Sequence, residues 1–312
     1  MSEMEIKKRT REGKMKKIFA ITFVAFFCAS VALGDEVDTG LSSMATEQLK
    51  VSTRQMIRSG INSDETLKMT RLMLENRFRE EHALRAHQII IDAHKEGLPV
   101  EPIMSKVYEG IAKQVKDRNI VQAMEKVRYR YSFAYKQANE LTPDKARVRL
   151  IGNNIAEGLA AGMNDDDAGR VMYRLQHREE QMTKAQVGDL AVETFGFARD
   201  MARLGVSSRS TTDIVCQALQ HHYSAKEMTR MRKSFMNHSR NFSPTTLSER
   251  YLDAISRGRS VENLESLDRV GEGGSSWGPG GSGGSGSGYG GGGSGMGVGG
   301  HRGGSGGRGG KR

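Results

Sequence analysis

Cysteine and proline are scarce in this sequence, which limits how the chain can be stabilised. Its 312 residues include two cysteines, five prolines and one tryptophan. Cys28 lies in an N-terminal apolar run that we expect to be removed, and Cys216 then has no intramolecular disulfide partner. The position of Cys216 in an apolar helical stretch predicts a buried thiol, with a disulfide to a second chain as the alternative.

Short motifs of common catalytic sites are also missing. Outside the Gly-rich C-terminal end there is no Gly-x-Ser-x-Gly nucleophile elbow, and the chain has no Gly-x-x-x-x-Gly-Lys-Ser/Thr loop and no His-Glu-x-x-His site. We therefore expect a protein that is not an enzyme and that uses no cofactor. A hydrolase or metal-dependent enzyme with an unrecognised site is the third hypothesis.

Charge of one sign is concentrated at the two ends of the chain. The formal net charge is +10, but residues 1–34 hold seven basic and three acidic side chains, and residues 271–312 hold four and one. Residues 35–270 are left with 36 basic and 33 acidic side chains. A body this nearly neutral predicts a charged, soluble surface rather than an extended phosphate-binding field.

The N-terminal residues have the pattern of a signal peptide. A lysine pair at 16–17 precedes an apolar run at 18–33, and Ala32 and Gly34 supply small residues before a cleavage point. The run is shorter than the ~20 residues that a membrane-spanning helix needs. We therefore predict bacterial export to the periplasm or beyond, with Met15 as an alternative start and an uncleaved anchor as the alternative outcome.

The body of the chain is expected to be helical almost throughout. Good helix formers dominate residues 50–270, and no stretch alternates apolar and polar residues as a half-buried strand does. Helix breaks are predicted at 60–65 and 97–102, because each begins with a glycine suited to a helix C-terminus. Asn62 or Ser63 can cap the next helix at the first break, and Pro102 suits an early helical position at the second.

A repeated pattern relates the two halves of this helical body. Gly205 follows Gly97 by 108 residues, and the apolar positions after each glycine keep that offset. The matched apolar pairs are Val107 and Val215, Ile111 and Leu219, Val115 and Tyr223, Ile120 and Met228, and Val127 and Phe235. Gly162 matches Gly60, and a shortened third start begins at Arg257. We interpret the pattern as a duplication, with chance similarity among amphipathic helices as the alternative.

One segment of the first half carries a family resemblance. Residues 97–113 read Gly-Leu-Pro-Val-Glu-Pro-Ile-Met-Ser-Lys-Val-Tyr-Glu-Gly-Ile-Ala-Lys. This segment resembles a set of exported bacterial helical proteins of unknown function, which share a Gly-Leu-Pro-x-Glu-Pro and Glu-Gly-Leu/Ile-Ala-Lys pattern. The resemblance is weaker at Gly205-Val206-Ser207, which lacks the prolines. It implies a helical fold and an exported location, and it implies no activity.

The C-terminal segment differs from the body in composition. Residues 271–312 contain 24 glycines and seven serines. Such a composition cannot bury enough apolar surface to offset backbone entropy, so we predict a disordered tail. Arg302 and Arg308 each begin an Arg-Gly-Gly triplet, which raises the hypothesis of nucleic-acid binding; the other reading is a tether in weak contact with anionic envelope surfaces.

Together these patterns predict an all-α fold of short helices in a duplicated helical-hairpin, repeat-like array. The expected order is a signal peptide (1–34), a linker (35–49), a first helical unit (50–150), a second unit with the shortened third start (151–270) and a disordered tail (271–312). We expect no transmembrane helix after processing.

Basic and aromatic residues alternate at one place in the body. Residues 128–136 read Arg-Tyr-Arg-Tyr-Ser-Phe-Ala-Tyr-Lys, which could stack bases and bind a single strand. On a helix, however, Tyr131 and Tyr135 share a face, which favours packing in the core. Tyr129, Tyr131 and Tyr135 are therefore interaction candidates with core packing as the favoured reading, and the RNP1 motif of RNA-binding domains is absent.

Histidines and acids do not form a convincing metal site. His87 and His94 share a helical face but lie about 10 Å apart along the axis, too far to bind one ion, and His82 points away from both. We expect these histidines to be solvated or to cap helices. Residues 164–169 lack two ligands of a calcium loop, so their acids are expected to cap a helix N-terminus.

The leading functional hypothesis is an exported, non-enzymatic scaffold that binds envelope proteins or assembles with itself. Stacked helix pairs present grooves that suit partner segments. A nucleic-acid-binding protein that uses the Arg-Gly-Gly tail is the second hypothesis.

Overall fold

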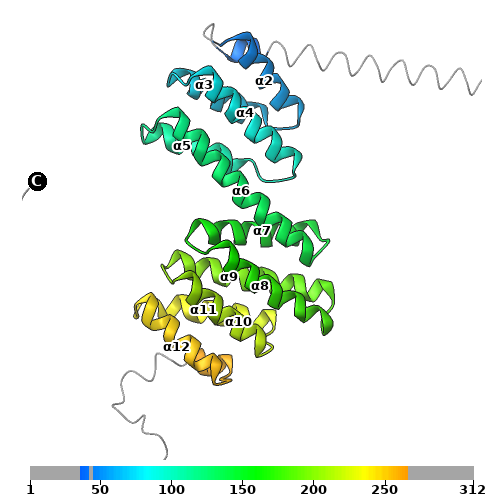
Figure 1. The fold of residues 1–312 in the computed structure, drawn as a ribbon, viewed down its shortest axis with the longest axis vertical. Coiled ribbons are helices and arrows are strands. Elements are labelled where there is room, and N and C mark those ends of the chain that lie inside the picture. The colour runs from blue at the N-terminus through cyan, green and yellow to red at the C-terminus, as the bar shows by residue number, and fades with distance from the viewer. Residues whose placement is uncertain (1–35, 42–44, 266–312) are drawn as a thin grey trace, which may run out of the picture. The chain divides into compact units, whose positions relative to one another are not determined.

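The structure is a computed structural model that describes residues 36–41 and 45–265 of the chain (Figure 1). Its helices are α2 (Glu47–Arg58), α3 (Ser63–Glu75), α4 (Glu80–Lys95), α5 (Glu101–Ala112), α6 (Asp117–Leu141), α7 (Lys145–Ala160), α8 (Asp165–His177), the 3-10 helix η1 (Arg178–Glu180), α9 (Lys184–Arg203), α10 (Ser208–Gln220), α11 (Ala225–His238), α12 (Pro244–Ser256) and α13 (Val261–Glu265). The described part contains no strand, which confirms the all-α prediction. The predicted signal peptide and the Gly-rich C-terminal segment lie outside the described residues.

Contacts between helices arrange the described part in two rows. Row A consists of α2, α4, α6, α7, α9, α11 and α13, and each of these helices packs against the next. In row B, α3 packs against α5, and α8, α10 and α12 pack in succession. Along most of the chain a row-A helix is followed by a row-B helix, but α6 is followed directly by α7 (Figure 1). The outer side of α6 therefore has no row-B helix of its own.

Tight turns that contain a glycine share one geometry at the ends of four row-A helices and of α12 (Pro244–Ser256). After α2, Gly60 has a φ of 96°, its N–H donates to the carbonyl of Ile57, and the N–H of Ile61 donates to the carbonyl of Met56. These two bonds define a Schellman motif, in which a left-handed residue satisfies the last carbonyls of a helix. The same pair of bonds occurs at Gly97, Gly162, Gly205 and Gly258, all with positive φ. The predicted breaks at 60–65 and 97–102 are confirmed.

Side-chain caps start most of the helices that follow these turns. The Asn62 side chain accepts from the N–H of Glu65 at 3.0 Å, and Pro102 lies in the first turn of α5. Asn164 caps α8 by accepting from the N–H of Asp167 at 2.8 Å, with three acids in the first turn. The capping interpretation of residues 164–169 is therefore confirmed, because carboxylates at this end stabilise the helix dipole.

One hydrophobic core runs through both predicted helical units. Buried side chains from Leu49 to Leu264 form a single cluster, and the boundary predicted between residues 150 and 151 lies inside α7. Cys216 is buried in this core, as predicted, and burial raises the pKa of its thiol. The duplication itself stays a prediction, although Gly97 and Gly205 end row-A helices in the same way.

Candidate binding surface

The aromatic segment of α6 is divided between the core and the surface. Tyr131 and Tyr135 are buried, and the Tyr135 hydroxyl donates to Asn153 Oδ1 at 2.9 Å. Burial raises the pKa of Tyr135 to about 12, and the nearby Tyr131 adds to the shift. Tyr129 is 64% exposed. Packing is thus confirmed for Tyr131 and Tyr135, while Tyr129 keeps its ring in solvent; Arg302 and Arg308 lie outside the described residues.

A glycine in α7 explains why Tyr135 can pack so closely. A Cβ built on Gly152 would lie 2.4 Å from Cδ2 of the Tyr135 ring, which no real side chain tolerates. The ring therefore lies directly on the α7 backbone, and its hydroxyl reaches Asn153 one residue along. This contact fixes α6 against α7 and leaves the opposite side of α6 facing outward.

The outward side of α6 carries cations around the exposed Tyr129. We name it the α6 stripe, and its members are Arg118, Gln122, Lys126, Tyr129, Arg130, Phe133 and Lys136. Phe133 is partly buried against the core. Within the described part of the chain, none of the four cations of the stripe forms a salt bridge, and the buried Nε of Arg130 has no hydrogen-bond partner.

An open groove runs along this stripe. It encloses about 520 Å³ and is lined by Gln122, Glu125, Lys126, Tyr129 and Arg130. Glu125 does not neutralise the groove, because its carboxylate pairs with Arg85 of α4 at 2.6 Å. An unbalanced positive charge beside an exposed aromatic ring can attract an anionic group and bury apolar surface at once.

Arg128 shows that neighbouring basic residues in this segment have different roles. Its guanidinium pairs with Asp92 at 3.3 Å and also with Glu96, both on α4. Arg128 thus joins two row-A helices, whereas Arg130, two positions along the helix, points elsewhere and has no acid partner among the described residues. The alternation of basic and aromatic residues does not form one continuous binding face.

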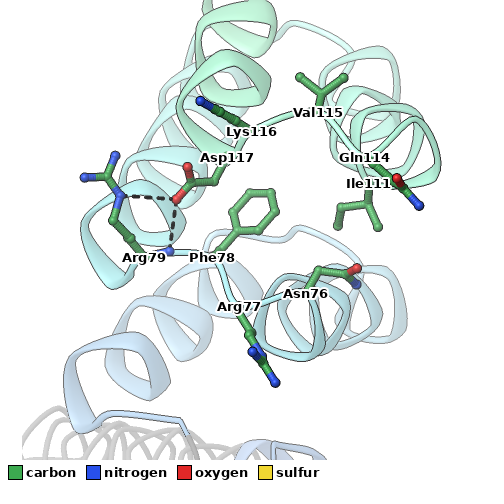
Figure 2. A pocket seen from close by; sticks show the side chains of 9 residues that line it. All are labelled: Asn76, Arg77, Phe78, Arg79, Ile111, Gln114, Val115, Lys116 and Asp117. Carbon is green, nitrogen blue, oxygen red and sulfur yellow. Dashed lines mark hydrogen bonds and ion pairs between the residues drawn. The ribbon is translucent and has the colours of Figure 1, made fainter.

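A second open cleft lies at the N-terminal end of α6 (Figure 2). It encloses about 450 Å³ between the turn that joins α3 to α4 and the turn that joins α5 to α6. Phe78 points into the cleft, with Ile111 and Val115 on the other side (Figure 2). Arg77 and Lys116 lie at opposite margins with their side chains directed away from Phe78 (Figure 2), and neither has an ion-pair partner in the described part of the chain. We name this site the turn cleft.

Asp117 connects the two sides of the turn cleft. Its carboxylate accepts from the backbone N–H of Arg79 at 3.1 Å and lies 2.7 Å from His82 Nδ1. Partial burial raises the pKa of this carboxyl, but the hydrogen bonds from His82, Arg79 and Arg118 outweigh burial and hold the pKa well below its usual value. Asp117 is therefore ionised at neutral pH, and its carboxylate contacts Arg79 and His82 rather than Arg77 or Lys116.

Two of the residues around the turn cleft have strained backbones. Arg77 has a φ of 56° and Gln114 a φ of 53°, in the left-handed region that side chains with a Cβ rarely adopt. His222, which ends α10, has a φ of 62°. These three turns have the Schellman pair of hydrogen bonds too, but the five turns named above have glycine at the left-handed position. A side chain kept at a strained position is one mark of functional sites.

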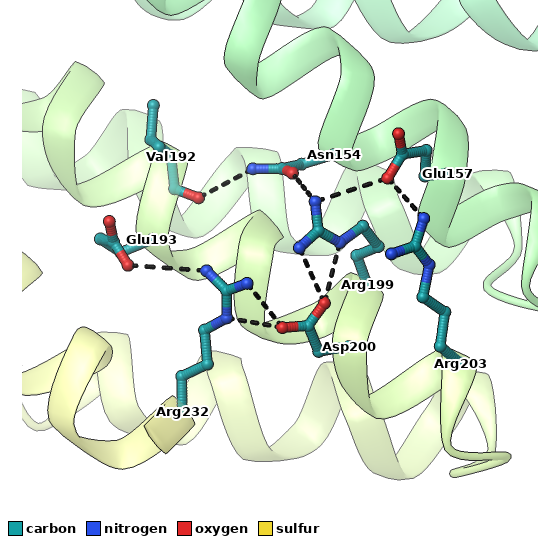
Figure 3. Close-up of polar contacts among 8 residues, drawn as sticks. All are labelled: Asn154, Glu157, Val192, Glu193, Arg199, Asp200, Arg203 and Arg232. Carbon is teal, nitrogen blue, oxygen red and sulfur yellow. Dashed lines mark hydrogen bonds and ion pairs between the residues drawn. The ribbon is translucent and has the colours of Figure 1, made fainter. Parts of the chain in front are cut away.

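A contrasting group of cations joins α7, α9 and α11 (Figure 3). Arg203 pairs with Glu157 at 2.7 Å, Arg232 pairs with Asp200 at 2.6 Å, and Arg199 contacts both carboxylates. We name this set the row-A network. Its other members are Asn154, which links Arg199 to the carbonyl of Val192, and Glu193. Each arginine of the row-A network has an acid partner, so the network stabilises the row and offers little unbalanced charge.

The histidine prediction is wrong at one position. His87 is completely buried, and its ring nitrogens lie 3.0 Å from Thr70 Oγ1 and 3.0 Å from Ser52 Oγ. Burial lowers its pKa to about 4, so the ring is neutral at pH 7. His87 is a polar member of the core because Thr70 and Ser52 satisfy both nitrogens. His82 instead pairs with Asp117.

Metal binding and membrane crossing find no support in the described residues. Within 36–41 and 45–265, no group of three or more His, Cys, Asp or Glu side chains is arranged to hold a metal ion. None of the helices described is both long enough and apolar enough to cross a bilayer.

Comparison with known proteins gives no match. No protein-family model, no curated protein and no solved structure is similar to this chain. Functional inference therefore depends on the chemistry of the two open sites on and beside α6.

The sequence contained a signal for the α6 stripe that motif searching does not use. Neither Lys126 nor Arg130 has an acid three or four positions away in either direction. On a helix these are the only positions from which a same-helix partner can reach, so both cations lack local neutralisation. Whether another helix supplies a partner depends on tertiary structure, as Arg128 shows.

Proposed function

We propose that this chain is an exported, non-enzymatic helical scaffold that binds an envelope protein through the α6 stripe. The observation that carries the proposal is a set of cations around Tyr129 that have no acid partner among residues 36–41 and 45–265, on the outer side of a row-A helix that no row-B helix follows. Exposed aromatic rings and arginines are the residue types that contribute most to protein interfaces. The partner surface that fits is acidic, because the stripe carries positive charge without compensation.

A nucleic-acid strand fits the stripe less well. Single-strand binders stack successive bases on several aromatic rings. Of the three tyrosines in this segment, only Tyr129 is exposed, and Arg128 is committed to Asp92 and Glu96. The stripe thus has one exposed tyrosine ring, whereas the stacking of successive bases requires several.

Self-association through the stripe is also disfavoured. A two-fold symmetric dimer places the same surface of each copy against the other. Two copies of the stripe would bring Lys126, Arg130 and Lys136 against their equivalents, and like charges in an interface cost several kcal/mol. A different, acidic protein is therefore the better partner.

Site-specific photo-crosslinking tests the proposal directly. The crosslinking amino acid p-benzoylphenylalanine replaces Tyr129 in the producing cells, and crosslinked products are identified by mass spectrometry. Tyr173 is the matched control, because it is 58% exposed but its ring contacts His177 at 4.2 Å in α8. We expect a discrete protein adduct from position 129 and none from position 173.

Charge reversal distinguishes specific binding from chance proximity. Lys126→Glu together with Arg130→Glu should abolish the adduct at position 129, since the partner is held by opposite charge. Lys184→Glu reverses one charge at an exposed position in the first turn of α9 and should leave the adduct intact. An adduct that survives the double reversal, or one to nucleic acid, contradicts the proposal.

The proposed export is tested separately. It is supported by the lysine pair, the apolar run and the small residues within residues 16–34. N-terminal sequencing of the chain from fractionated cells should give a mature product that begins near residue 35. A cytoplasmic product that begins at Met1 contradicts export and returns the nucleic-acid hypothesis to first place.

A further inference from the structure

The turn cleft is an independent site, and its counterpart in the second half of the chain is filled. The counterpart lies between the ends of α8 and α10, where Arg178 follows α8 directly. Its Nη1 donates to the carbonyl of Leu219 at 3.1 Å and lies 2.8 Å from His222 Nδ1. The guanidinium thus bridges the ends of two row-B helices and occupies the space between them.

In the first half, the residue in the same position is too short to bridge the gap. Asn76 follows α3 as Arg178 follows α8, but its Nδ2 donates back to the carbonyl of Leu72 within its own helix at 2.8 Å. The end of α5, at Ile111 and Gln114, receives no side chain from Asn76. The cleft in Figure 2 is open because this one side chain does not cross it.

The walls of the turn cleft combine an apolar floor with positive margins. Phe78 and Ile111 are partly buried, and Val115 is 39% exposed. The carboxylate of Asp117, which also lines the cleft, is engaged with His82 and Arg79, so Arg77 and Lys116 have no acid partner among the residues that the structure describes. An occupant with an apolar side chain and a neighbouring carboxylate would complement both features.

We propose that the turn cleft binds an extended peptide segment in which a carboxylate side chain lies next to an apolar side chain. The apolar side chain contacts Phe78, Ile111 and Val115, and the carboxylate pairs with Arg77 and Lys116. The cleft is a second binding site, and its occupant does not depend on the proposed role of the α6 stripe. The strained φ of Arg77 places a cation where five other Schellman turns have glycine, and Gln114 and His222 share its strained conformation without a formal charge at Gln114.

Binding to a synthetic probe tests the proposal. The probe is a fluorescent, acetylated and amidated peptide of alternating Leu and Glu, and the comparison peptide has Gln at each Glu position. Fluorescence anisotropy is measured with the whole chain. We expect the Glu peptide to bind at least about tenfold more tightly than the Gln peptide, the factor that corresponds to one favourable charge contact.

Variants taken from the second half of the chain locate the bound peptide. Asn76→Arg installs the residue that fills the counterpart gap, and we expect it to reduce binding by about tenfold or more because the side chain occupies the cleft. Lys116→Ser introduces the residue found at Ser224 after α10 and should weaken the Glu peptide but not the Gln peptide. Thermal unfolding of each variant checks that the fold is retained.

Other results overturn the proposal. Equal binding of the Glu and Gln peptides would show that the cleft does not recognise a carboxylate. Failure of both peptides to bind at millimolar concentration would show that the cleft is not a peptide-binding site. Binding that Asn76→Arg leaves intact but Tyr129→Ala abolishes assigns the peptide to the α6 stripe instead. A single-stranded oligonucleotide that displaces the Glu peptide at a lower concentration assigns the cleft to nucleic acid.

Discussion

The row-A network and the α6 stripe are both rich in basic side chains, yet they differ in what lies opposite each cation. In the network, carboxylates from neighbouring helices meet every arginine, as Asp200 meets Arg232 at 2.6 Å. In the stripe, the cations face solvent beside Tyr129. Paired charges hold helices in place, whereas unpaired charges leave a field that a partner can satisfy. The predictions below test this division between stabilising and binding roles.

The largest difference in stability is expected between variants of Tyr135 and Tyr129, whose side chains lie on opposite sides of α6. Tyr135→Ala removes a buried ring and its hydrogen bond to Asn153, and should lower the free energy of unfolding by about 3 kcal/mol. Tyr129→Ala should change it by less than about 0.5 kcal/mol, because the ring is exposed. Urea unfolding measures both. Equal losses would mean that Tyr129 also has a structural role.

Asp200 provides the next test, within the row-A network. Asp200→Asn removes the charge that both Arg199 and Arg232 contact, and should cost about 2 kcal/mol because each of these partly buried cations loses its shorter ion pair. Asp166→Asn is the control, since Asp166 is exposed in the first turn of α8. The comparison is made by urea unfolding at neutral pH. A cost at Asp200 no greater than at Asp166 would show that the network contributes little.

Arg77 and Gly97 test the two kinds of turn against each other. Arg77→Gly relieves the left-handed strain and should raise the free energy of unfolding by about 0.5–1 kcal/mol, while it weakens the Glu peptide. Gly97→Ala should lower stability by about 1 kcal/mol through φ alone, because nothing lies within 4 Å of the added Cβ. Thermal unfolding of the two variants shows whether each substitution raises or lowers the melting temperature. A destabilised Arg77→Gly variant would show that the arginine is there for the fold.

A smaller effect is expected at Asp117, in how the stability of the protein depends on pH under acidic conditions. Because its folded pKa is lowered, its contribution is present above the unfolded carboxyl pKa of about 4 and is lost as the pH falls through the folded value. Asp117→Asn should therefore flatten the decline of stability with acid that the unchanged protein shows below about pH 4. Melting temperatures measured from pH 2 to pH 7 follow this difference, and parallel curves would contradict it.

The smallest effect on stability is expected in the α6 stripe itself. Lys126→Ala and Arg130→Ala should each change the free energy of unfolding by less than about 0.5 kcal/mol, because neither cation has an acid partner in the part of the chain that the structure describes. Both should reduce the partner adduct at position 129. A large loss of stability in either variant would show that the cation stabilises the fold, as the arginines of the row-A network do, and contradict its assignment to binding.

Local sequence chemistry was enough to predict the helices and their ends. Glycine at the left-handed position, Asn62 and Asn164 as caps, and Pro102 in a first turn act through bonds within a few residues. The helical face shared by Tyr131 and Tyr135 likewise follows from the 3.6-residue period. His87 was missed because its partners, Ser52 and Thr70, come from two other helices.

The sequence by itself determined that this chain forms short, capped helices and which side of α6 is apolar. Only the tertiary structure decided which cations are neutralised, because Arg128 and Arg130 differ solely in the acids that α4 brings near one of them. The same holds for the turn cleft: whether a gap between helix ends is open depends on how far one side chain reaches across it, and Asn76 is shorter than Arg178.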